Sequence, residues 1–509
     1  MAEEAVSGAD WTPDEWFEFL MKKFDEKIPG ERRAVSVNTP KTRRERLDLL
    51  WSYYIGDPPL PTVSEKYKPT FKEVMRKARS NYATMSVDVM TDRSILQGVS
   101  TEADKDLDGD DISRQIADES GWAALQRDLQ TYLFVCGEAY ALVASPLEGV
   151  PDAMPMIMAE DPRFAVGQRD PANPRYLRAF VKYYLDEIAD QQVALLFVDN
   201  AKYTWRREPG QTSKSFKLDE WELTDTEAVQ GLELMGGVPA VRFENKLAMG
   251  EFEPHIDLLD RIMDGVFQRI VIGWYQSFRQ RAVRGNLDGA EDFTVDNDST
   301  NFIRTVADDE LVDLFQADPG ALWLVPEGVD FWESEQADLT PLINAIRDDV
   351  KEFAAATRTP MHIITPDAAN QTAEGASLMR EALVDKITDR QARQSSPWVL
   401  VWQIAFSLAQ QEARQKGVKL LWAKVDRSSL QARADAIAKT KGVLSRKRQL
   451  ISILELTPEE AKLNEAELIQ ESMALDNSFS PAPATASASA RNSAQPATTG
   501  AQVPERAAA

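Results

Sequence analysis

The sequence is poor in cysteine and histidine, with one and two among its 509 residues. The single cysteine, Cys136, excludes an intrachain disulfide, and its place in the apolar run 132–137 predicts a buried structural thiol. Two histidines without a metal-binding partner nearby in the sequence disfavour a histidine-based site. We expect His255 to be packed or to face solvent. His362 lies in a loop, where packing is favoured over a functional role.

Long hydrophobic runs are also lacking. The most apolar segments, 270–278 and 398–409, are interrupted by glycine or polar residues and fall short of the ~20 apolar residues that span a membrane. The N-terminus, Met1 to Ala5, is acidic, whereas a signal peptide begins with basic residues before an apolar stretch. We therefore expect a protein that is soluble or held in a soluble assembly, is not secreted and has no membrane partner.

Positive charge is in deficit, because 58 Lys and Arg stand against 82 Asp and Glu and give a net charge of −24. This balance argues against a broad basic face that grips nucleic acid. The densest basic run, 439–448, is interpreted as a charged helix face in preference to a nucleic-acid contact. Residues 476–509 are mainly Ala, Ser, Thr and Pro, a composition that predicts a disordered tail.

Catalytic motifs are missing as well: the sequence has no phosphate-binding loop, dinucleotide fingerprint or zinc-type cysteine pair. Acidic clusters at 104–111, 288–298 and 308–310 have the oxygen ligands that Mg²⁺ prefers. The first resembles a calcium loop only superficially, since it lacks a glycine at the sixth position and a properly spaced final glutamate. Solvated acidic loops are favoured, and we predict no catalytic residue, no metal and no cofactor.

The first half of the chain predicts a mixed domain. With 43% hydrophobic residues, the length suggests about three domains. Helical patterns cover much of 11–60, 70–96 and 112–135. Alternating, turn-bounded segments then predict strands, at 139–143, 156–158, 175–184, 192–198, 202–206 and 221–224. The fold class is α+β, mainly helical, with an antiparallel sheet.

The second half is dominated by long helices. Apolar residues advance in steps of three and four from Phe252 to Phe278 and predict one helix through Arg284, roughly 45 to 50 Å long. An acidic, turn-rich excursion follows, and the chain is helical again at 339–357. A Pro- and Thr-rich loop then leads to a helix over 375–416, kinked at Pro397, a strand at 419–425 and helices over 429–473.

This order resembles the portal proteins of tailed double-stranded DNA bacteriophages, the head-to-tail connectors. The resemblance covers about residues 40 to 475 and rests also on local sequence. The matching segments are Arg43 to Asp57 followed by Pro58 to Leu60, Gly137 to Tyr140, Glu160 to Arg163, Phe243 to Asn245, Thr359 to Ile364 and Gly375 to Met379. None of these segments is catalytic, so the resemblance identifies a scaffold.

The resemblance implies a division of the chain. It implies an N-terminal wing at 1–243, stem helices at 244–284 and 339–357, and a clip at 285–338 between them. It further implies a tunnel loop at 358–374, a long wing helix and strand at 375–425, a crown at 426–475 and a disordered tail at 476–509. Stem packing would involve one apolar stripe, namely Ile256, Leu259, Met263, Val266, Ile270 and Trp274.

The implied function is a ring of twelve subunits at one capsid vertex that passes DNA and has no enzymatic activity. The DNA-facing tunnel-loop residues would be Thr365, Asp367, Asn370, Gln371 and Thr372, and the DNA-proximal basic residues Arg279, Arg281, Arg284 and Arg358. The implied partners are double-stranded DNA in transient contact, the terminase large subunit, major capsid and scaffolding proteins, and head-completion or adaptor proteins. The chain would lie in the virion, and in the host cytoplasm during assembly.

Two alternatives stay open. A metal-dependent DNA-processing enzyme such as a nuclease would use the acidic clusters, but it lacks a motif and has no need of such long helices. Another minor head protein would not need the series of helix, excursion, helix, loop and helix.

Overall fold

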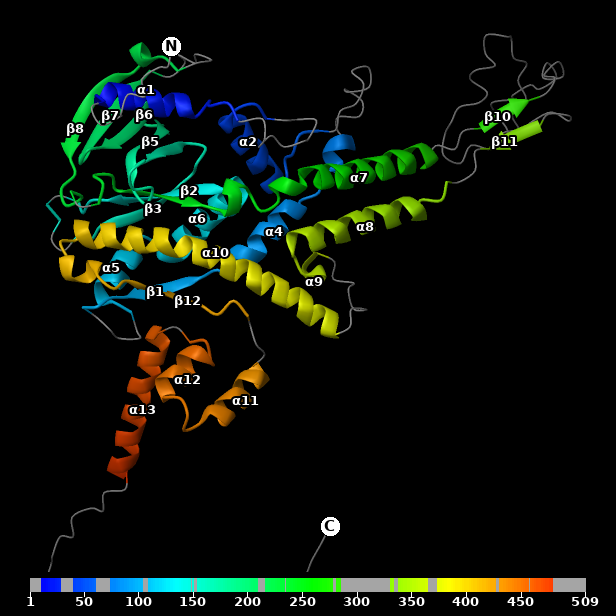
Figure 1. Cartoon of the computed structure of the whole chain (residues 1–509). Coiled ribbons are helices and arrows are strands. Elements are labelled where there is room, and N and C mark those ends of the chain that lie inside the picture. The colour runs from blue at the N-terminus through cyan, green and yellow to red at the C-terminus, as the bar shows by residue number, and fades with distance from the viewer. Residues whose placement is uncertain are drawn as a thin grey trace, which may run out of the picture.

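The structure is a computed structural model of the whole chain. It describes residues 11–28, 40–60, 74–103, 109–147, 149–150, 153–208, 216–233, 235–277, 281–284, 330–333, 337–364, 373–426, 430–456 and 458–478. Figure 1 shows a body of helices and sheets, a pair of helices that projects from it, and a smaller helical group below. The described part is α+β, as the sequence predicts.

The largest sheet is an antiparallel meander. Its strand order is β4-β5-β6-β7-β8, from β4 (Ala165–Arg169), β5 (Leu177–Asp186), β6 (Gln191–Val198), β7 (Ala201–Arg207) and β8 (Glu222–Ala228). Helix α1 (Pro13–Lys23) covers one face, and its Phe17 ring stacks on Trp205 at 4.5 Å. A capping box between Thr12 and Glu15 starts this helix.

A second sheet, of order β3-β2-β9, lies in the main core. It consists of β2 (Glu138–Ala144), β3 (Met156–Glu160) and β9 (Ala240–Glu244), and β2 is almost wholly buried. A third pair, β1 (Leu96–Ser100) with β12 (Lys419–Trp422), joins segments more than 300 residues apart. Around these sheets pack α2 (Arg43–Tyr54), α4 (Tyr82–Thr91), α5 (Asp111–Glu119), α6 (Trp122–Cys136) and α10 (Ala373–Leu408).

Two antiparallel helices project from this body (Figure 1). They are α7 (Ile256–Ser277) and α8 (Thr340–Thr357), and we call them the α7–α8 hairpin. Beyond their outer ends, β10 (Arg281–Arg284) pairs antiparallel with β11 (Asp330–Glu333), so both ends of segment 285–329 are held together. The short helix α9 (Met361–Ile364) follows α8 near the body.

The C-terminal helices form the smaller group in Figure 1. They are α11 (Leu430–Thr440), α12 (Arg446–Ser452) and α13 (Pro458–Ser478), in the region where the sequence predicts helices. Helix α13 starts at Pro458, a position where proline is favoured because the first helical N–H has no partner within the helix. The basic run 439–448 lies across the end of α11 and the start of α12.

Several predicted boundaries are wrong. The helix expected to run through Arg284 ends at Ser277, because 281–284 pairs with β11 as a strand. The helix expected over 112–135 is divided at Gly121, which has φ of +60°. The helix expected to reach residue 416 ends at Leu408, and Gln410 with φ of +57° turns the chain. Leu96, assigned to a helix, begins β1, and strand β4 was not predicted.

Candidate functional site: the helical hairpin and its charged base

The inner half of the α7–α8 hairpin belongs to the main core. Ile256, Leu259 and Met263 of α7 are each 3% exposed, and Phe353 of α8 is fully buried. Gly265 lies where Ile346 of α8 packs directly on α7, because a Cβ at this position would lie 2.8 Å from Cγ1 of Ile346. The small residue therefore lets the helices pack tightly where they leave the body.

The outer half of α7 carries apolar side chains that a single chain covers only partly. Trp274 is 44% exposed, and the other apolar residues of this half are intermediate in exposure, namely Val266, Phe267, Ile270, Val271 and Ile272. At 1.5 Å per residue, the 22 residues of α7 extend about 33 Å. Partly exposed apolar residues in such a row are a candidate surface for contact with another chain.

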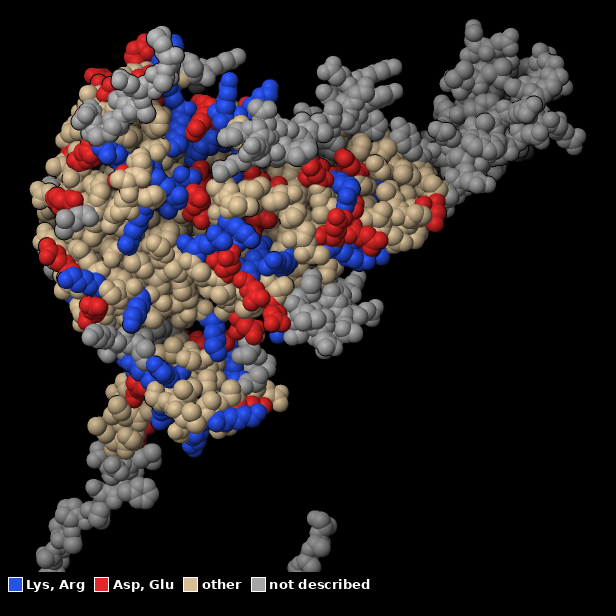
Figure 2. Space-filling view, in the orientation of Figure 1, with Lys and Arg blue, Asp and Glu red and all other residues tan. Residues whose placement is uncertain are grey.

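The polar faces of the hairpin are acidic. Arg261 of α7 bonds Asp349 and Glu352 of α8 at 2.8 and 2.5 Å, and these exposed pairs contribute at most about 1 kcal/mol each. The two helices together contain six acidic and four basic residues, and Figure 2 shows acidic side chains gathered here. At the inner end, the Tyr53 hydroxyl of α2 donates a hydrogen bond to Asp260.

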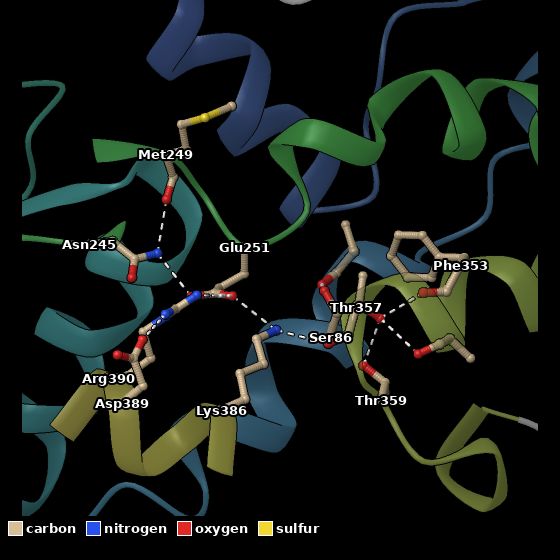
Figure 3. A network of polar contacts seen from close by, with 12 residues as sticks. Ser86, Asn245, Met249, Glu251, Phe353, Thr357, Thr359, Lys386, Asp389 and Arg390 are labelled. Atoms are coloured by element: carbon tan, nitrogen blue, oxygen red, sulfur yellow. Dashed lines mark hydrogen bonds and ion pairs between the residues drawn. The ribbon is translucent and has the colours of Figure 1, made fainter. Parts of the chain in front are cut away.

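A network of ion pairs and hydrogen bonds connects the hairpin to α10 (Figure 3). We call its residues, Asn245, Glu251, Thr357, Lys386 and Arg390, the charged joint. Glu251 precedes α7, and its side chain is 3% exposed. Its carboxylate lies 2.9 Å from Nζ of Lys386 and 2.5 Å from Nε of Arg390, both on α10, and it accepts a hydrogen bond of 2.9 Å from Asn245. One carboxylate thus joins the start of α7 to α10.

The charge state of this carboxylate follows from its partners. Burial by itself raises the pKa of Glu251, but Lys386 and Arg390 outweigh it through charge and hydrogen bonds and lower the pKa to about 2. Glu251 is therefore ionised at neutral pH. Removing its charge would leave the buried Lys386 without a carboxylate partner, and Arg390 with Asp389 alone.

The same lysine holds the end of α8. Nζ of Lys386 donates a 2.9 Å hydrogen bond to the carbonyl oxygen of Thr357, and the hydroxyl of Thr357 lies 2.9 Å from that of Thr359. Arg358, between these threonines, takes φ of +57° and ends the helix. The charged joint thus sets where the chain leaves α8, seven residues before segment 365–372. A cavity of about 280 Å³ opens beside it.

The predicted site residues have different outcomes. Thr365, Asp367, Asn370, Gln371, Thr372 and Arg279 lie outside the described residues. Arg281 and Arg284 belong to strand β10 in place of the predicted helix end. Arg358 is exposed at the end of α8.

The predicted packing stripe divides in two. Ile256, Leu259 and Met263 are buried within the chain, whereas Val266, Ile270 and Trp274 are not. The first three therefore contribute to the core of the chain, whereas Val266 and Ile270 are intermediate in exposure and Trp274 is exposed.

Sequence reasoning missed the charged joint. Lys386 and Arg390 stand four residues apart and so share a face of α10. Their partner Glu251 lies more than 130 residues earlier, and no local pattern connects them.

Other predictions concern isolated residues. Cys136 is a buried free thiol, as expected. His255 is half-buried beside the joint, and His362 is exposed on α9. In the acidic loop, Asp110 is fully buried, caps α5 and pairs with Arg414 at 2.9 Å, whereas 104–108 lie outside the description. The clusters at 288–298 and 308–310, and the tail from 479, also lie outside it.

Within the described ranges, no group of three His, Cys, Asp or Glu residues is placed to hold a metal ion. No helix in those ranges is long and apolar enough to cross a membrane.

The described chain is an α+β protein with a projecting helical hairpin, and no protein family and no curated protein matches it. Chains in solved structures do match it. A chain in the neck of a native gene transfer agent (GTA) particle, computed with C12 symmetry, is 11% identical, with 80% of this chain and 98% of that chain covered and a TM-score of 0.40. A chain in the neck of an empty GTA particle, computed with C6 symmetry, is 12% identical, with 76% of this chain and 92% of that chain covered and a TM-score of 0.41. A chain in the virion of the native particle is 13% identical, with 84% of this chain and 96% of that chain covered and a TM-score of 0.42.

Proposed function

We propose that this chain is the subunit of a portal, the ring-shaped channel at one capsid vertex through which double-stranded DNA is packaged and ejected. The observation that carries the proposal is the partly exposed apolar row on the outer part of α7, which continues from the core at Val266 to Trp274. Such a row needs neighbours, and hairpins arranged around a ring give every copy the same ones. The order of segments described above supports the same proposal.

In this proposal the α7–α8 hairpin is the stem, and residues 285–338 form the clip beyond it. Residues 1–243 and 375–425 build the wing, 426–475 the crown, and 358–374 the tunnel loop. Twelve subunits make the ring. The charged joint would hold the stem and the start of the tunnel loop at a fixed position on the long helix α10, since it contacts all three.

The negative charge of the hairpin favours a channel through which DNA moves, rather than a surface that binds DNA tightly. Acidic walls repel phosphates and keep affinity for DNA low, so a duplex can slide. Thr365, Asp367, Asn370, Gln371 and Thr372 would make transient contacts with DNA. The local basic exceptions would be Arg279, Arg281, Arg284 and Arg358.

The same proposal names the partners and the place. The ring would dock the terminase large subunit during packaging and head-completion or adaptor proteins afterwards, and it would contact major capsid and scaffolding proteins. It would form in the host cytoplasm, remain at one vertex of the virion and catalyse no reaction.

The test combines native mass spectrometry with negative-stain microscopy of the purified full chain. The expected result is a closed ring with a central hole wide enough for a DNA duplex. A compact monomer that cleaves DNA with Mg²⁺ would establish the nuclease alternative instead. A monomer without such cleavage, under conditions where the chain is folded, would also refute the portal and leave the minor head protein.

A further inference from the structure

A second charged region lies where α1 and α2 meet the sheets. A cavity of about 290 Å³ here has five cationic side chains in its lining, namely Lys23, Lys27, Arg43, Arg46 and Arg242. Met249 lines this cavity and also the one beside the charged joint. Figure 2 shows basic side chains gathered on this part of the body. In a chain of net charge −24, such a local excess of positive charge points to an anion.

The carboxylates at this cavity already have partners. Glu138 lies 2.7 Å from Nη2 of Arg43 and 2.8 Å from Nη2 of Arg242, and Glu253 lies 2.6 Å from Nη2 of Arg46. Burial raises the pKa of Glu138, but the three arginines outweigh it and lower the pKa to about 2. Both acids are thus engaged, and Arg242 also lies 3.4 Å from Glu244 outside the lining. Five cations therefore stand against four carboxylates, including Glu26 of the lining.

Hydrogen-bonding capacity is also left over. Among the described residues, Nη1 of Arg43 and Nε of Arg242 are buried without an acceptor. Lys23 donates only to the neutral amide oxygen of Gln168, at 2.6 Å. Burial, and next the positive charge of Arg242, lower the pKa of Lys23. Among the described residues, no carboxylate pairs with Lys23, so an acceptor with negative charge would complete its pairing.

We propose that this cavity binds a compact tetrahedral oxyanion, inorganic phosphate, between Lys23, Arg43 and Arg242. The anion accepts a hydrogen bond from Nζ of Lys23, and the positive charges of Arg43 and Arg242, which also line the cavity, attract it. The cavity has room for it together with several waters. The three residues belong to α1, α2 and β9, so a bound anion fastens the N-terminal helices to the sheets. This site is independent of the proposed portal function.

The test measures phosphate binding to the full chain by ³¹P NMR line broadening and by thermal unfolding, against sodium chloride at equal ionic strength. Phosphate is expected to raise the melting temperature more than chloride does. Lys23→Gln should weaken phosphate binding about tenfold, the value of one charge-assisted hydrogen bond. Lys22→Gln is the matched control, because Lys22 is the adjacent residue, is 60% exposed and pairs with Glu18 away from the cavity.

A second variant separates binding from general stability. Glu138→Gln removes the carboxylate between Arg43 and Arg242, so its melting temperature should fall and phosphate should restore more of it than in the wild type. Equal effects of phosphate and chloride in the wild type and in Glu138→Gln would overturn the proposal. So would equal binding by the Lys22 and Lys23 variants.

A short single-stranded oligonucleotide serves as the competing probe. If it protects the chain and inorganic phosphate does not, the basic residues form a surface for a polymer and the proposed ion site is wrong. If phosphate binds and the oligonucleotide does not compete, the enclosed site is supported.

Discussion

The charged joint allows a sharp test through Glu251→Gln. The pKa of Glu251 is lowered from its ordinary value of 4.5 to about 2, so its ionisation stabilises the folded state by about 3 kcal/mol at neutral pH. Because the folded pKa is the lower one, this contribution is complete above about pH 5 and is lost as the pH falls toward 2. The substitution leaves the buried Lys386 without a carboxylate partner, while Arg390 keeps Asp389, and it should destabilise by about 3 kcal/mol at pH 7.

The assay is urea unfolding followed by tryptophan fluorescence from pH 7 down to pH 2.5. The wild type should lose more stability across this range than Glu251→Gln, and the two should converge at the acid end. Glu18→Gln is the control, because Glu18 forms an exposed pair with Lys22 and should cost less than about 0.5 kcal/mol. Equal acid sensitivity of wild type and Glu251→Gln would refute the reasoning about the joint.

Three further predictions concern the hairpin and the segment after it. Gly265→Ala should destabilise the protein by about 1 to 3 kcal/mol in thermal unfolding, because the new Cβ would lie 2.8 Å from a side chain of α8. Gly273→Ala is the control and should be neutral or stabilising, because its Cβ would meet no atom within 4 Å. The reverse order of stabilities would contradict the packing. Ile270→Glu should prevent ring assembly in native mass spectrometry while circular dichroism stays unchanged, and intact rings would show that the exposed row contacts no neighbour. Deletion of 365–372 should leave the ring intact and impair DNA packaging or retention, so normal packaging would remove the tunnel-loop assignment.

Element types could largely be predicted from the sequence because they depend on nearby residues. The apolar spacing on α7 and α8 and the alternation along β5, β6 and β7 repeat over one or two turns or strand steps, and the structure has these elements close to the predicted places. Boundaries failed where a distant segment decided them. Residues 281–284 form a strand because 330–333 pair with them.

The candidate site was only half accessible to prediction. The apolar stripe from Ile256 to Trp274 is visible in the sequence, but its spacing cannot show that the first half is covered by the chain's own core. The charged joint has no local signature, since Glu251 and Arg390 come together through the packing of α10 against β9 and the start of α7.

The sequence by itself therefore determined the α+β class, the buried single thiol, the two helices on either side of the acidic excursion and the excess of negative charge. Only the tertiary structure decided where basic residues come together in this acidic chain. Arginines and lysines gather at the two cavities because segments far apart in the sequence meet there, for example Arg43 with Arg242. Charge composition is a sum over the chain, whereas the field at a site depends on the few groups that folding brings within a few ångströms.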